Sequence, residues 1–414
     1  MWLLGTDPRV IFDREFPYEN RYLTYFAKFA WLLQKPDLLQ FFNPQQLYEL
    51  DYLGFGGYRP GADYVPASSP YVHLPREEKE NWIRCLWAKF CAPVLRQRPG
   101  SLFYSEKAPV WLAPALRRCL PCFTVYNVRD PRDLFLSTNA FMKKKRELGF
   151  ARSSGDSDYD HARRLAQAFL NLFDNYYVDR RRSDTLLVKY EDYILDRSGV
   201  AEKLRGVIGV NTVPDADEPY VETHATTPDP RQSVNRWTRE PIPSDILSFL
   251  EGNLHEEMAA LDYMPSVRRE ASPVRKISFA QGGVSLRKID HSSDGILEQA
   301  EDWAVAQVGG PDFHIFLPLE PFEAAEVKEV WVSVSGEIGD FFSLYWCRRD
   351  SRFSENACMN VSYTPSTHWA VLTVPVHLHP EWKGTIKSLR LDLFNSHVRP
   401  HKGIGHLRWV RLVG

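Results

Sequence analysis

The segment that decides the fold runs from Thr124 to Met142 and reads Thr-Val-Tyr-Asn-Val-Arg-Asp-Pro-Arg-Asp-Leu-Phe-Leu-Ser-Thr-Asn-Ala-Phe-Met. Its first part, 123–128, is a β-branched and aromatic run that predicts a buried strand. Asp130 is a candidate N-cap for a helix that begins at Pro131. A strand that leads straight into a helix puts backbone N–H groups and the positive end of the helix dipole at the carboxyl edge of a sheet. The segment therefore predicts an anion site.

Two side chains in this segment have the chemistry to hold a phosphate. Arg129 stands at the end of the strand, where its guanidinium can grip a phosphate with two parallel hydrogen bonds. Ser137 follows about two helical turns later and can present its hydroxyl to the same anion. The alternative is that Arg129 only forms an Arg–Asp salt bridge that caps an ordinary strand-to-helix turn.

Composition sets the class of protein. The 414 residues suffice for two or three domains, and 44% hydrophobic with 25% charged residues is typical of a soluble globular protein. A net charge of −2 gives no general attraction to nucleic acid, so any anion site must be local. The six cysteines are too scattered for a disulfide framework, and no apolar run approaches the roughly 20 residues of a membrane span. The start lacks the basic residues of a signal peptide, so we expect a soluble, cytoplasmic protein.

Two further segments carry candidate functional residues. Near the start, Glu15 and Glu19 precede an aromatic-rich helix predicted over 22–33, where they are either site carboxylates or acids at a helix N-terminus. Later in the chain, Ser233 and Arg236 lie in the phrase Arg-Gln-Ser-Val-Asn-Arg-Trp, in which the arginine either binds an anion or stacks on a surface aromatic. Further helices are predicted over 161–182 and 242–261, with a strand from Thr185 that ends in Tyr-Glu-Asp.

The phrase Val-Arg-Asp-Pro-Arg-Asp-(x)3-Ser over 128–137 resembles the 3′-phosphate-binding segment of the sulfotransferases. These enzymes take a sulfuryl group from 3′-phosphoadenosine-5′-phosphosulfate (PAPS). The resemblance implies that Arg129 and Ser137 hold the 3′-phosphate of this nucleotide. It also implies that Ser233 and Arg236 belong to a late loop that closes the nucleotide site.

The same resemblance, to the tyrosylprotein and bacterial glycan branches of the family, implies a set of catalytic residues. Glu15 takes the place of the general base, with Glu19 as the second choice, and Lys107 lines the active site after a short strand. For Lys107 the alternative is a solvated lysine in a turn. The matching segments follow the family's order and span roughly 7–264.

One expected element is missing from the sequence. Sulfotransferases carry a strand and a phosphate loop of the form Pro-Arg-Ser-Gly-Thr-Thr that wraps the 5′-phosphosulfate, and no such segment occurs in these 414 residues. Two interpretations are open. The protein is a sulfotransferase whose loop is encoded upstream of Met1, or it is a catalytically inactive glycan-binding or scaffolding protein that kept the fold.

The character of the sequence changes at Pro265. A charged, proline-containing stretch leads into period-2 runs that predict strands over 313–317, 330–335, 342–346, 358–363, 369–374, 386–393 and 407–412. Short strands at regular intervals favour a β-sandwich or jelly roll. The phrase Trp-Lys-Gly-Thr-Ile-Lys-Ser-Leu-Arg-Leu-Asp over 382–392 resembles the last strands of carbohydrate-binding-like sandwiches appended to bacterial glycan-synthesis enzymes. The tryptophans Trp346, Trp369 and Trp382 either stack on sugars or fill the core.

The sequence thus predicts two domains. Residues 1–264 form an α/β, parallel-sheet domain of the sulfotransferase type, related to P-loop NTPases but without its first strand and phosphate loop. Residues 265–276 form a linker, and 277–414 form an all-β sandwich. The expected reaction is sulfuryl transfer from PAPS to a hydroxyl, on a glycan in the first place, with no metal, no nucleic acid and no membrane span.

Overall fold

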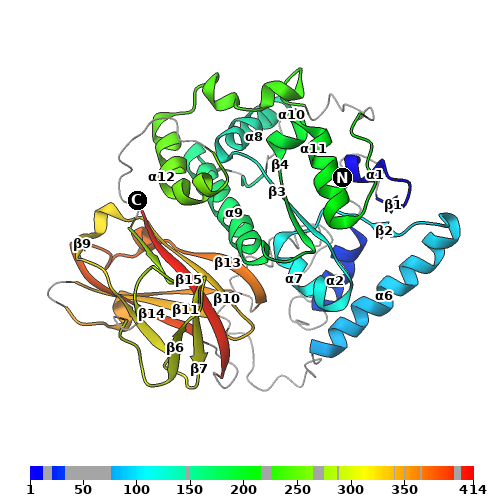
Figure 1. Cartoon of the computed structure of the whole chain (residues 1–414). Coiled ribbons are helices and arrows are strands. Elements are labelled where there is room, and N and C mark those ends of the chain that lie inside the picture. Colours follow the sequence, from blue (N-terminus) through cyan, green and yellow to red (C-terminus); the bar gives the residue numbers. More distant parts are fainter. Residues whose placement is uncertain are drawn as a thin grey trace. The chain divides into compact units, whose positions relative to one another are not determined.

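The structure is a computed structural model that describes residues 1–12, 21–32, 76–145, 150–153, 155–215, 225–263, 275–286, 289–339, 341–348, 351–363, 366–395 and 402–414. The chain separates into two compact units, one containing the described residues up to 263 and the other those from 275 onward (Figure 1). Of the predicted linker, 265–274 lie outside the described residues, and a strand begins at Arg275. The predicted domain limits stay a prediction.

The first unit alternates helices with short strands, as the sequence predicts. The strand of the segment 124–142 begins at Thr124, and the helix after it begins at Pro131. The elements are α1 (Trp2–Gly5), β1 (Val10–Ile11), α2 (Tyr22–Leu32), α6 (Arg76–Gln97), β2 (Phe103–Tyr104), α7 (Ala113–Cys119), β3 (Thr124–Val128), α8 (Pro131–Lys145), α9 (Asp158–Asp179), β4 (Thr185–Lys189), α10 (Tyr190–Leu195), α11 (Arg197–Ile208) and α12 (Ser244–Ala260).

Parallel strands are present as two pairs. Strand β1 pairs with β2, and β3 pairs with β4 in a register that sets Val128 opposite Lys189. In the part of the chain that the structure describes, the two pairs do not join into one ladder. One apolar cluster nevertheless takes Val10, Phe103, Val125 and Val188 from all four strands. The α/β prediction is therefore met by small parallel sheets, and the wider sulfotransferase sheet remains a prediction.

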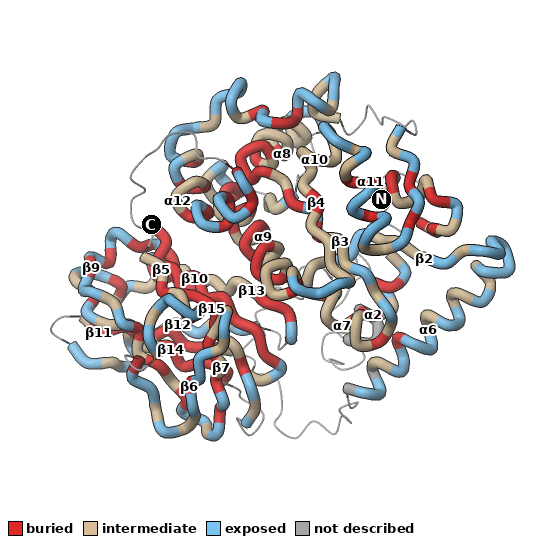
Figure 2. The backbone as a smooth tube through the Cα atoms, in the orientation of Figure 1, coloured by how far each residue is buried: buried red, intermediate tan, exposed pale blue. Residues whose placement is uncertain are grey.

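Helix α9 is the central helix of this unit, and it begins earlier than the sequence pattern predicts. The stretch 150–160 reads as a polar loop, yet α9 begins at Asp158 because Ser157 and Asp160 form a capping box. The Ser157 hydroxyl accepts the Asp160 N–H at 3.1 Å. Figure 2 shows the buried face of α9, which carries Ala162, Leu165, Ala166, Phe169, Leu170 and Phe173.

The second unit is a sandwich of two antiparallel sheets. One sheet has the order β13-β10-β15-β7-β6 with β5 added to β15, and the other has the order β12-β11-β14-β8 with β9 added to β14. The strands are β5 (Arg275–Ser278), β6 (Gly295–Gln299), β7 (Ala304–Val308), β8 (His314–Leu317), β9 (Phe322–Glu323), β10 (Glu329–Gly336), β11 (Phe341–Arg348), β12 (Cys358–Ser362), β13 (Ser366–Val374), β14 (Thr385–Asn395) and β15 (Gly403–Val413).

The core of the sandwich lies between its two sheets. Alternate residues of both sheets, such as Val332 from β10 and Leu344 from β11, belong to one apolar cluster. All seven strands predicted from the period-2 runs are present. The tryptophans of the alternative prediction are core residues, because Trp346, Trp369 and Trp382 are at most 8% exposed.

Four short strands of the sandwich were not predicted, namely β5, β6, β7 and β9. Strand β7 reads Ala-Val-Ala-Gln-Val, and alanine is depleted in strands, so its alternation gives a weak signal. It forms because β15 and β6 pair with its two edges.

Candidate functional site

The junction of β3 and α8 is built as the sequence predicts. Asp130 caps the helix, since its carboxylate accepts the backbone N–H of Arg132 at 2.9 Å and its carbonyl accepts the N–H of Leu134. Pro131 has no N–H of its own. The first backbone donor of α8 is therefore already used by Asp130. The anion site expected at this helix start stays a prediction.

Arg129 is held at the end of β3 by two neighbours. Its Nη2 donates to the carbonyl oxygen of Ser233 at 2.9 Å, and its guanidinium lies 4.4 Å from the centre of the Tyr190 ring. Its Nε is buried and has no hydrogen-bond partner among the described residues. The Arg129 side chain is therefore fixed in place with one strong donor unused.

Ser233 contacts both Arg129 and Tyr190 and holds them in position. Its hydroxyl donates to the carbonyl of Pro230 at 2.5 Å, so the Tyr190 hydroxyl, 3.0 Å away, is the donor in their mutual contact. Ser233 ends the 3₁₀ turn η2 (Pro230–Ser233) and is 3% exposed. Its contacts favour a role in positioning Arg129 over direct contact with a ligand.

Ser137 and Arg236 meet at a third residue, Thr226. The hydroxyls of Ser137 and Thr226 lie 3.2 Å apart, and Nη1 of Arg236 donates to the Thr226 hydroxyl at 3.5 Å. Arg236 opens the turn η3 (Arg236–Thr238) and is also paired with Glu240 at 2.6 Å. The four predicted nucleotide-binding residues are thus placed on two contact chains that share the segment 225–238.

The segment 225–238 is fastened along one face of α8. Besides Ser137, Asp133 accepts the backbone N–H of Trp237 at 2.9 Å, and Lys144 donates to the carbonyl of Ala225 at 2.9 Å. The guanidinium of Arg132 lies 3.7 Å from the centre of the Trp237 ring. These contacts spread over three turns of the helix and hold the segment in one register.

Asp133 is the most perturbed carboxyl of the site. It is fully buried, one of its oxygens has no partner among the described residues, and burial raises its pKa to about 6. Neighbouring carboxylates at Asp130 and Glu191 raise the pKa further, while Arg129 and the Trp237 N–H lower it.

The glutamate of the Tyr-Glu-Asp phrase, Glu191, stabilises the end of strand β3. Glu191 accepts the backbone N–H of Asp130 at 3.0 Å and the hydroxyl of Tyr263 at 2.8 Å. Arg132 is paired with Asp130 and with Glu251, both at 2.6 Å. These buried pairs position the junction, and the charge at Arg132 is neutralised by them.

Sequence reasoning missed Thr226, Tyr190 and the docking role of Asp133. Thr226 had no signal apart from its place in a Thr-Thr-Pro stretch shortly before the Ser-Arg-Trp phrase. Tyr190 belongs to the Tyr-Glu-Asp phrase, which could have suggested an aromatic platform for the arginine at the neighbouring strand end.

Of the three expected catalytic residues, Glu15, Glu19 and Lys107, the structure describes Lys107. Glu15 and Glu19 lie outside the described residues. Lys107 is exposed in the segment after β2, and it is not part of either contact chain. Its neighbour Glu106 is structural: its carboxylate accepts the backbone N–H groups of Leu23 and Thr24, both at 2.9 Å, and thereby caps α2.

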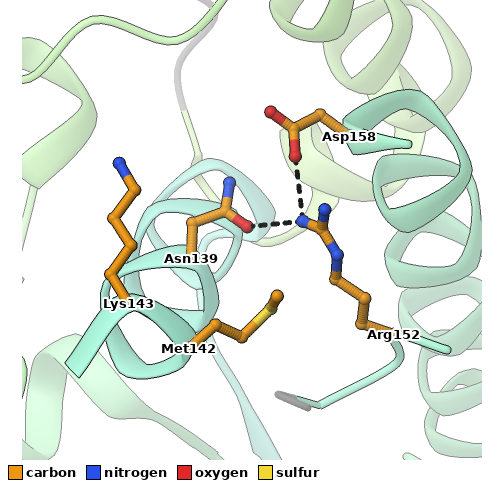
Figure 3. Close-up of a pocket in the computed structure, with 5 residues that line it drawn as sticks. All are labelled: Asn139, Met142, Lys143, Arg152 and Asp158. Carbon is orange, nitrogen blue, oxygen red and sulfur yellow. Dashed lines mark hydrogen bonds and ion pairs between the residues drawn. The ribbon is translucent and has the colours of Figure 1, made fainter. Parts of the chain in front are cut away.

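A pocket of about 270 Å³ opens on an adjacent face of α8 (Figure 3). Arg152 crosses it and donates to Asn139 at 3.0 Å and to Asp158 at 2.8 Å. Its lining is Asn139, Met142, Lys143, Arg152 and Asp158. The pocket is polar and mixed in charge.

Two further findings concern metals and membranes. Among the described residues, no group of three or more His, Cys, Asp or Glu side chains is placed to hold a metal ion. No helix in the described ranges has the length and apolar character needed to cross a membrane.

The described chain is therefore an α/β unit followed by a β-sandwich unit. No family profile and no curated protein matches it. Among solved structures it is similar to the sulfotransferase domain from the curacin biosynthetic pathway, with 15% identity over 46% of this chain and 75% of that domain, at a TM-score of 0.31.

Two carbohydrate-binding modules are also similar in part. A xylan-binding module from Roseburia intestinalis is 13% identical over 30% of this chain and 92% of the module, at a TM-score of 0.22. A family 29 module from Piromyces equi is 12% identical over 30% of this chain and 80% of the module, also at 0.22. These likenesses are too weak to define a family or to assign a function.

Proposed function

We propose that the first unit binds the 3′-phosphate of PAPS and transfers the sulfuryl group of this nucleotide to a glycan hydroxyl. The observation that carries the proposal is the joint anchoring of Arg129 and Arg236. Both guanidinium groups, far apart in the sequence, are fixed on the segment 225–238, and Ser137 is linked to Arg236 through one hydroxyl. The Arg129 guanidinium, the remaining donors of Arg236 beside its Glu240 pair, and the Ser137 hydroxyl suit a phosphate dianion.

The hydrogen-bond order supports a donor at Ser137. Arg236 donates to Thr226, so the Thr226 hydroxyl hydrogen is free to point to Ser137. The hydroxyl hydrogen of Ser137 is then available for a phosphate oxygen. The guanidinium of Arg236, which is the first donor in this series of hydrogen bonds, polarises the hydroxyls of Thr226 and Ser137. On the other side, the unused Nε of Arg129 supplies a second donor.

The reaction would be an in-line displacement. The acceptor hydroxyl oxygen attacks sulfur, the bond from sulfur to the 5′-phosphate oxygen breaks, and its electron pair stays on the departing 3′-phosphoadenosine-5′-phosphate. The hydroxyl proton passes to a carboxylate, for which Glu15 is proposed, and Lys107 is proposed to stabilise the transferring group. The chemistry requires no metal.

The second candidate is a protein that binds nucleotide or glycan without transfer. It is favoured because the contacts described above, at Arg129, Ser137 and Arg236, concern the binding of an anion and not the transfer of a group.

One experiment tests the proposed site directly. The chain is titrated calorimetrically with 3′-phosphoadenosine-5′-phosphate and with adenosine 5′-phosphate, which lacks the 3′-phosphate. We expect the first to bind at least about tenfold more tightly, the worth of one charge-assisted contact. Equal affinities would reject a 3′-phosphate site. Incubation with ³⁵S-labelled PAPS and a mixture of glycans then separates transfer from binding alone.

A further inference from the structure

The outer face of one sandwich sheet carries chemistry that the proposed transfer does not use. This face belongs to the strands β12-β11-β14-β8, whose opposite side forms the apolar core. The strand registers place its outward residues in two rows, each crossing four strands. At the usual strand spacing such a row is roughly 14 Å long. The first row is Phe316, Arg390, Tyr345 and Cys358, and the second is His314, Asp392, Ser343 and Asn360.

Aromatic rings line the first row. The Arg390 guanidinium lies 4.9 Å from the centre of the Tyr345 ring. The ring centres of Phe316 and Phe353 lie 5.5 Å apart, and Phe353 comes from the loop before β12. His314 packs edge-on against Phe316 at 5.3 Å. Tyr345, Phe316 and Phe353 are each partly exposed, unlike the buried Trp346, Trp369 and Trp382. We call this surface, defined by the two rows and Phe353, the Tyr345–Arg390 face.

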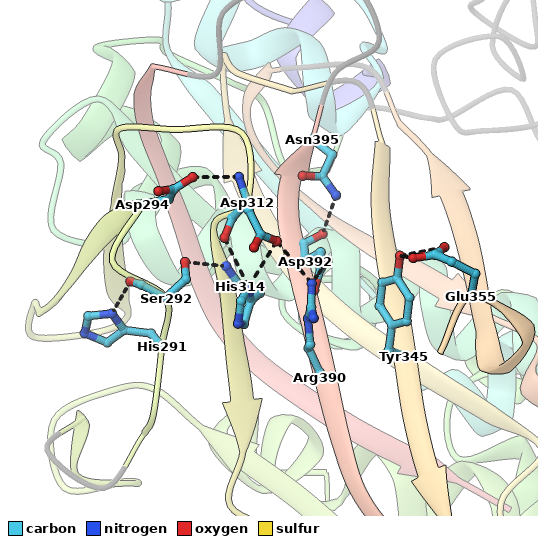
Figure 4. A network of polar contacts seen from close by, with 10 residues as sticks. All are labelled: His291, Ser292, Asp294, Asp312, His314, Tyr345, Glu355, Arg390, Asp392 and Asn395. Carbon is cyan, nitrogen blue, oxygen red and sulfur yellow. Dashed lines mark hydrogen bonds and ion pairs between the residues drawn. The ribbon is translucent and has the colours of Figure 1, made fainter. Parts of the chain in front are cut away.

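Its polar groups form one network, which Figure 4 shows. Arg390 donates to both oxygens of Asp392, at 2.6 and 2.5 Å, and to Asp312 at 3.2 Å. The Tyr345 hydroxyl donates to Glu355 at 3.0 Å. Among the described residues, Nη1 of Arg390 has no acceptor. The network therefore has one strong donor to spare, carboxylate lone pairs on the exposed Asp312 and Glu355, and partly exposed ring surface beside them.

The charge of the network disfavours an acidic ligand. Within it one guanidinium stands against the carboxylates of Asp312, Asp392 and Glu355. A sulfate or uronate would find the arginine of the network already neutralised and would meet the remaining negative charge. An uncharged polyol meets no such penalty, because its hydroxyls donate to the carboxylates and accept from Arg390.

We propose that the Tyr345–Arg390 face binds an uncharged oligosaccharide. The apolar faces of sugar rings would pack on Tyr345 and Phe353, and sugar hydroxyls would bond to Arg390 and to the exposed carboxylates of Asp312 and Glu355. This site is built from residues of the second unit alone, and its binding does not depend on sulfuryl transfer. Where transfer does occur, it would select neutral glycan as the material brought to the enzyme.

The test uses the full chain and three probes: cellohexaose, xylohexaose and a chondroitin sulfate hexasaccharide. Binding is measured by calorimetry at low and high salt for the wild type, Tyr345→Ala and Phe353→Ala. Phe150→Ala is the matched control, because Phe150 is an exposed phenylalanine of the first unit. We expect at least one neutral probe to bind with an affinity that salt does not change, and no binding of the sulfated probe.

Each variant of the face should weaken that binding by about tenfold, the worth of one aromatic contact, and the control should not. Phe353 lies in a loop, so its variant still decides the matter if Tyr345→Ala fails to fold in a thermal melt. The proposal is overturned if no neutral probe binds, if only the sulfated probe binds, or if Phe353→Ala binds like the wild type. Titration of the same variants with 3′-phosphoadenosine-5′-phosphate reports on the nucleotide site alone, so failure of either proposal can be told apart.

Discussion

Replacement of Arg129 by alanine tests the central assignment most sharply. In the structure the Arg129 guanidinium donates one hydrogen bond to the Ser233 carbonyl, and its buried Nε has no partner among the described residues. A phosphate that binds to the unused edge of the Arg129 guanidinium gains charge-assisted hydrogen bonds of about 1.5–3 kcal/mol each. The cost of removing water from the guanidinium and the phosphate reduces this gain. We therefore expect Arg129→Ala to cost about 2–3 kcal/mol, or roughly 30- to 150-fold, in affinity for 3′-phosphoadenosine-5′-phosphate.

The assay compares two nucleotides. Adenosine 5′-phosphate cannot make the 3′-phosphate contact, so its affinity should change by less than about twofold in Arg129→Ala. Arg129→Lys keeps the charge and loses the planar fork, and we expect an intermediate loss. Arg197→Ala is the control, since Arg197 also lies against a tyrosine ring, 4.9 Å from that of Tyr193, in another part of the unit.

The reasoning would be refuted by one result in particular. If Arg129→Ala keeps the full preference of the wild type for the nucleotide with a 3′-phosphate, then Arg129 is only a structural residue of the strand-to-helix turn. The structural interpretation predicts a different change, namely a loss of about 1 kcal/mol in the free energy of unfolding from the Ser233 and Tyr190 contacts. Urea unfolding of the same variant measures this quantity separately.

The other predictions concern stability and catalysis. Ser157→Ala removes the capping box of α9 and should lower the free energy of unfolding by about 1 kcal/mol, whereas Ser244→Ala, at a helix start without a side-chain cap, should change it by less than about 0.5 kcal/mol. Burial raises the pKa of Asp133 to about 6 in the folded protein, against roughly 3.9 in the unfolded chain, so ionisation of this carboxyl destabilises the fold as pH rises from about 4 to 6. Asp133→Asn should remove up to about 3 kcal/mol of this pH dependence of the free energy of unfolding. If urea unfolding of the wild type and of Asp133→Asn gave the same dependence on pH, the prediction would be contradicted. Trp346→Ala should cost about 3–5 kcal/mol because the side chain is 0% exposed, and a variant that melts like the wild type would show that the ring is not in the core. In a form that transfers sulfate, Glu15→Gln should lower the rate by about 10²–10⁴ and leave nucleotide affinity nearly unchanged, and a fully active variant would exclude Glu15 as the base.

The sequence predicted the elements best where a periodic pattern met a clear boundary. The strand before Arg129 and the helix from Pro131 follow from β-branched residues and capping chemistry, and the strands of the sandwich follow from alternation. The early start of α9 was hidden because polar residues that look like a loop were the helix cap.

The site was predicted only in part, for a physical reason. Arg129 and Ser137 share one strand-to-helix unit, so local spacing places them. The partner of Ser137 is Thr226, and the support of Arg129 is Tyr190 together with a main-chain carbonyl. Such partners are chosen by tertiary packing, and a backbone carbonyl leaves no mark in a sequence.

The alternation of the sandwich strands ties sugar recognition to strand register. On β14, Leu389 and Leu391 belong to the apolar core, and Arg390 and Asp392 alternate with them along the strand and lie on the opposite face. A slip of one residue would drive the charged pair into the apolar interior and carry the leucines outward, so the energy of the core enforces the position of the ligand-facing side chains. An insertion or deletion of one residue within β14 would therefore abolish recognition even where every side chain of the Tyr345–Arg390 face is kept. A point substitution at an exposed position of that face, by contrast, changes one contact to the sugar and leaves the strand register in place.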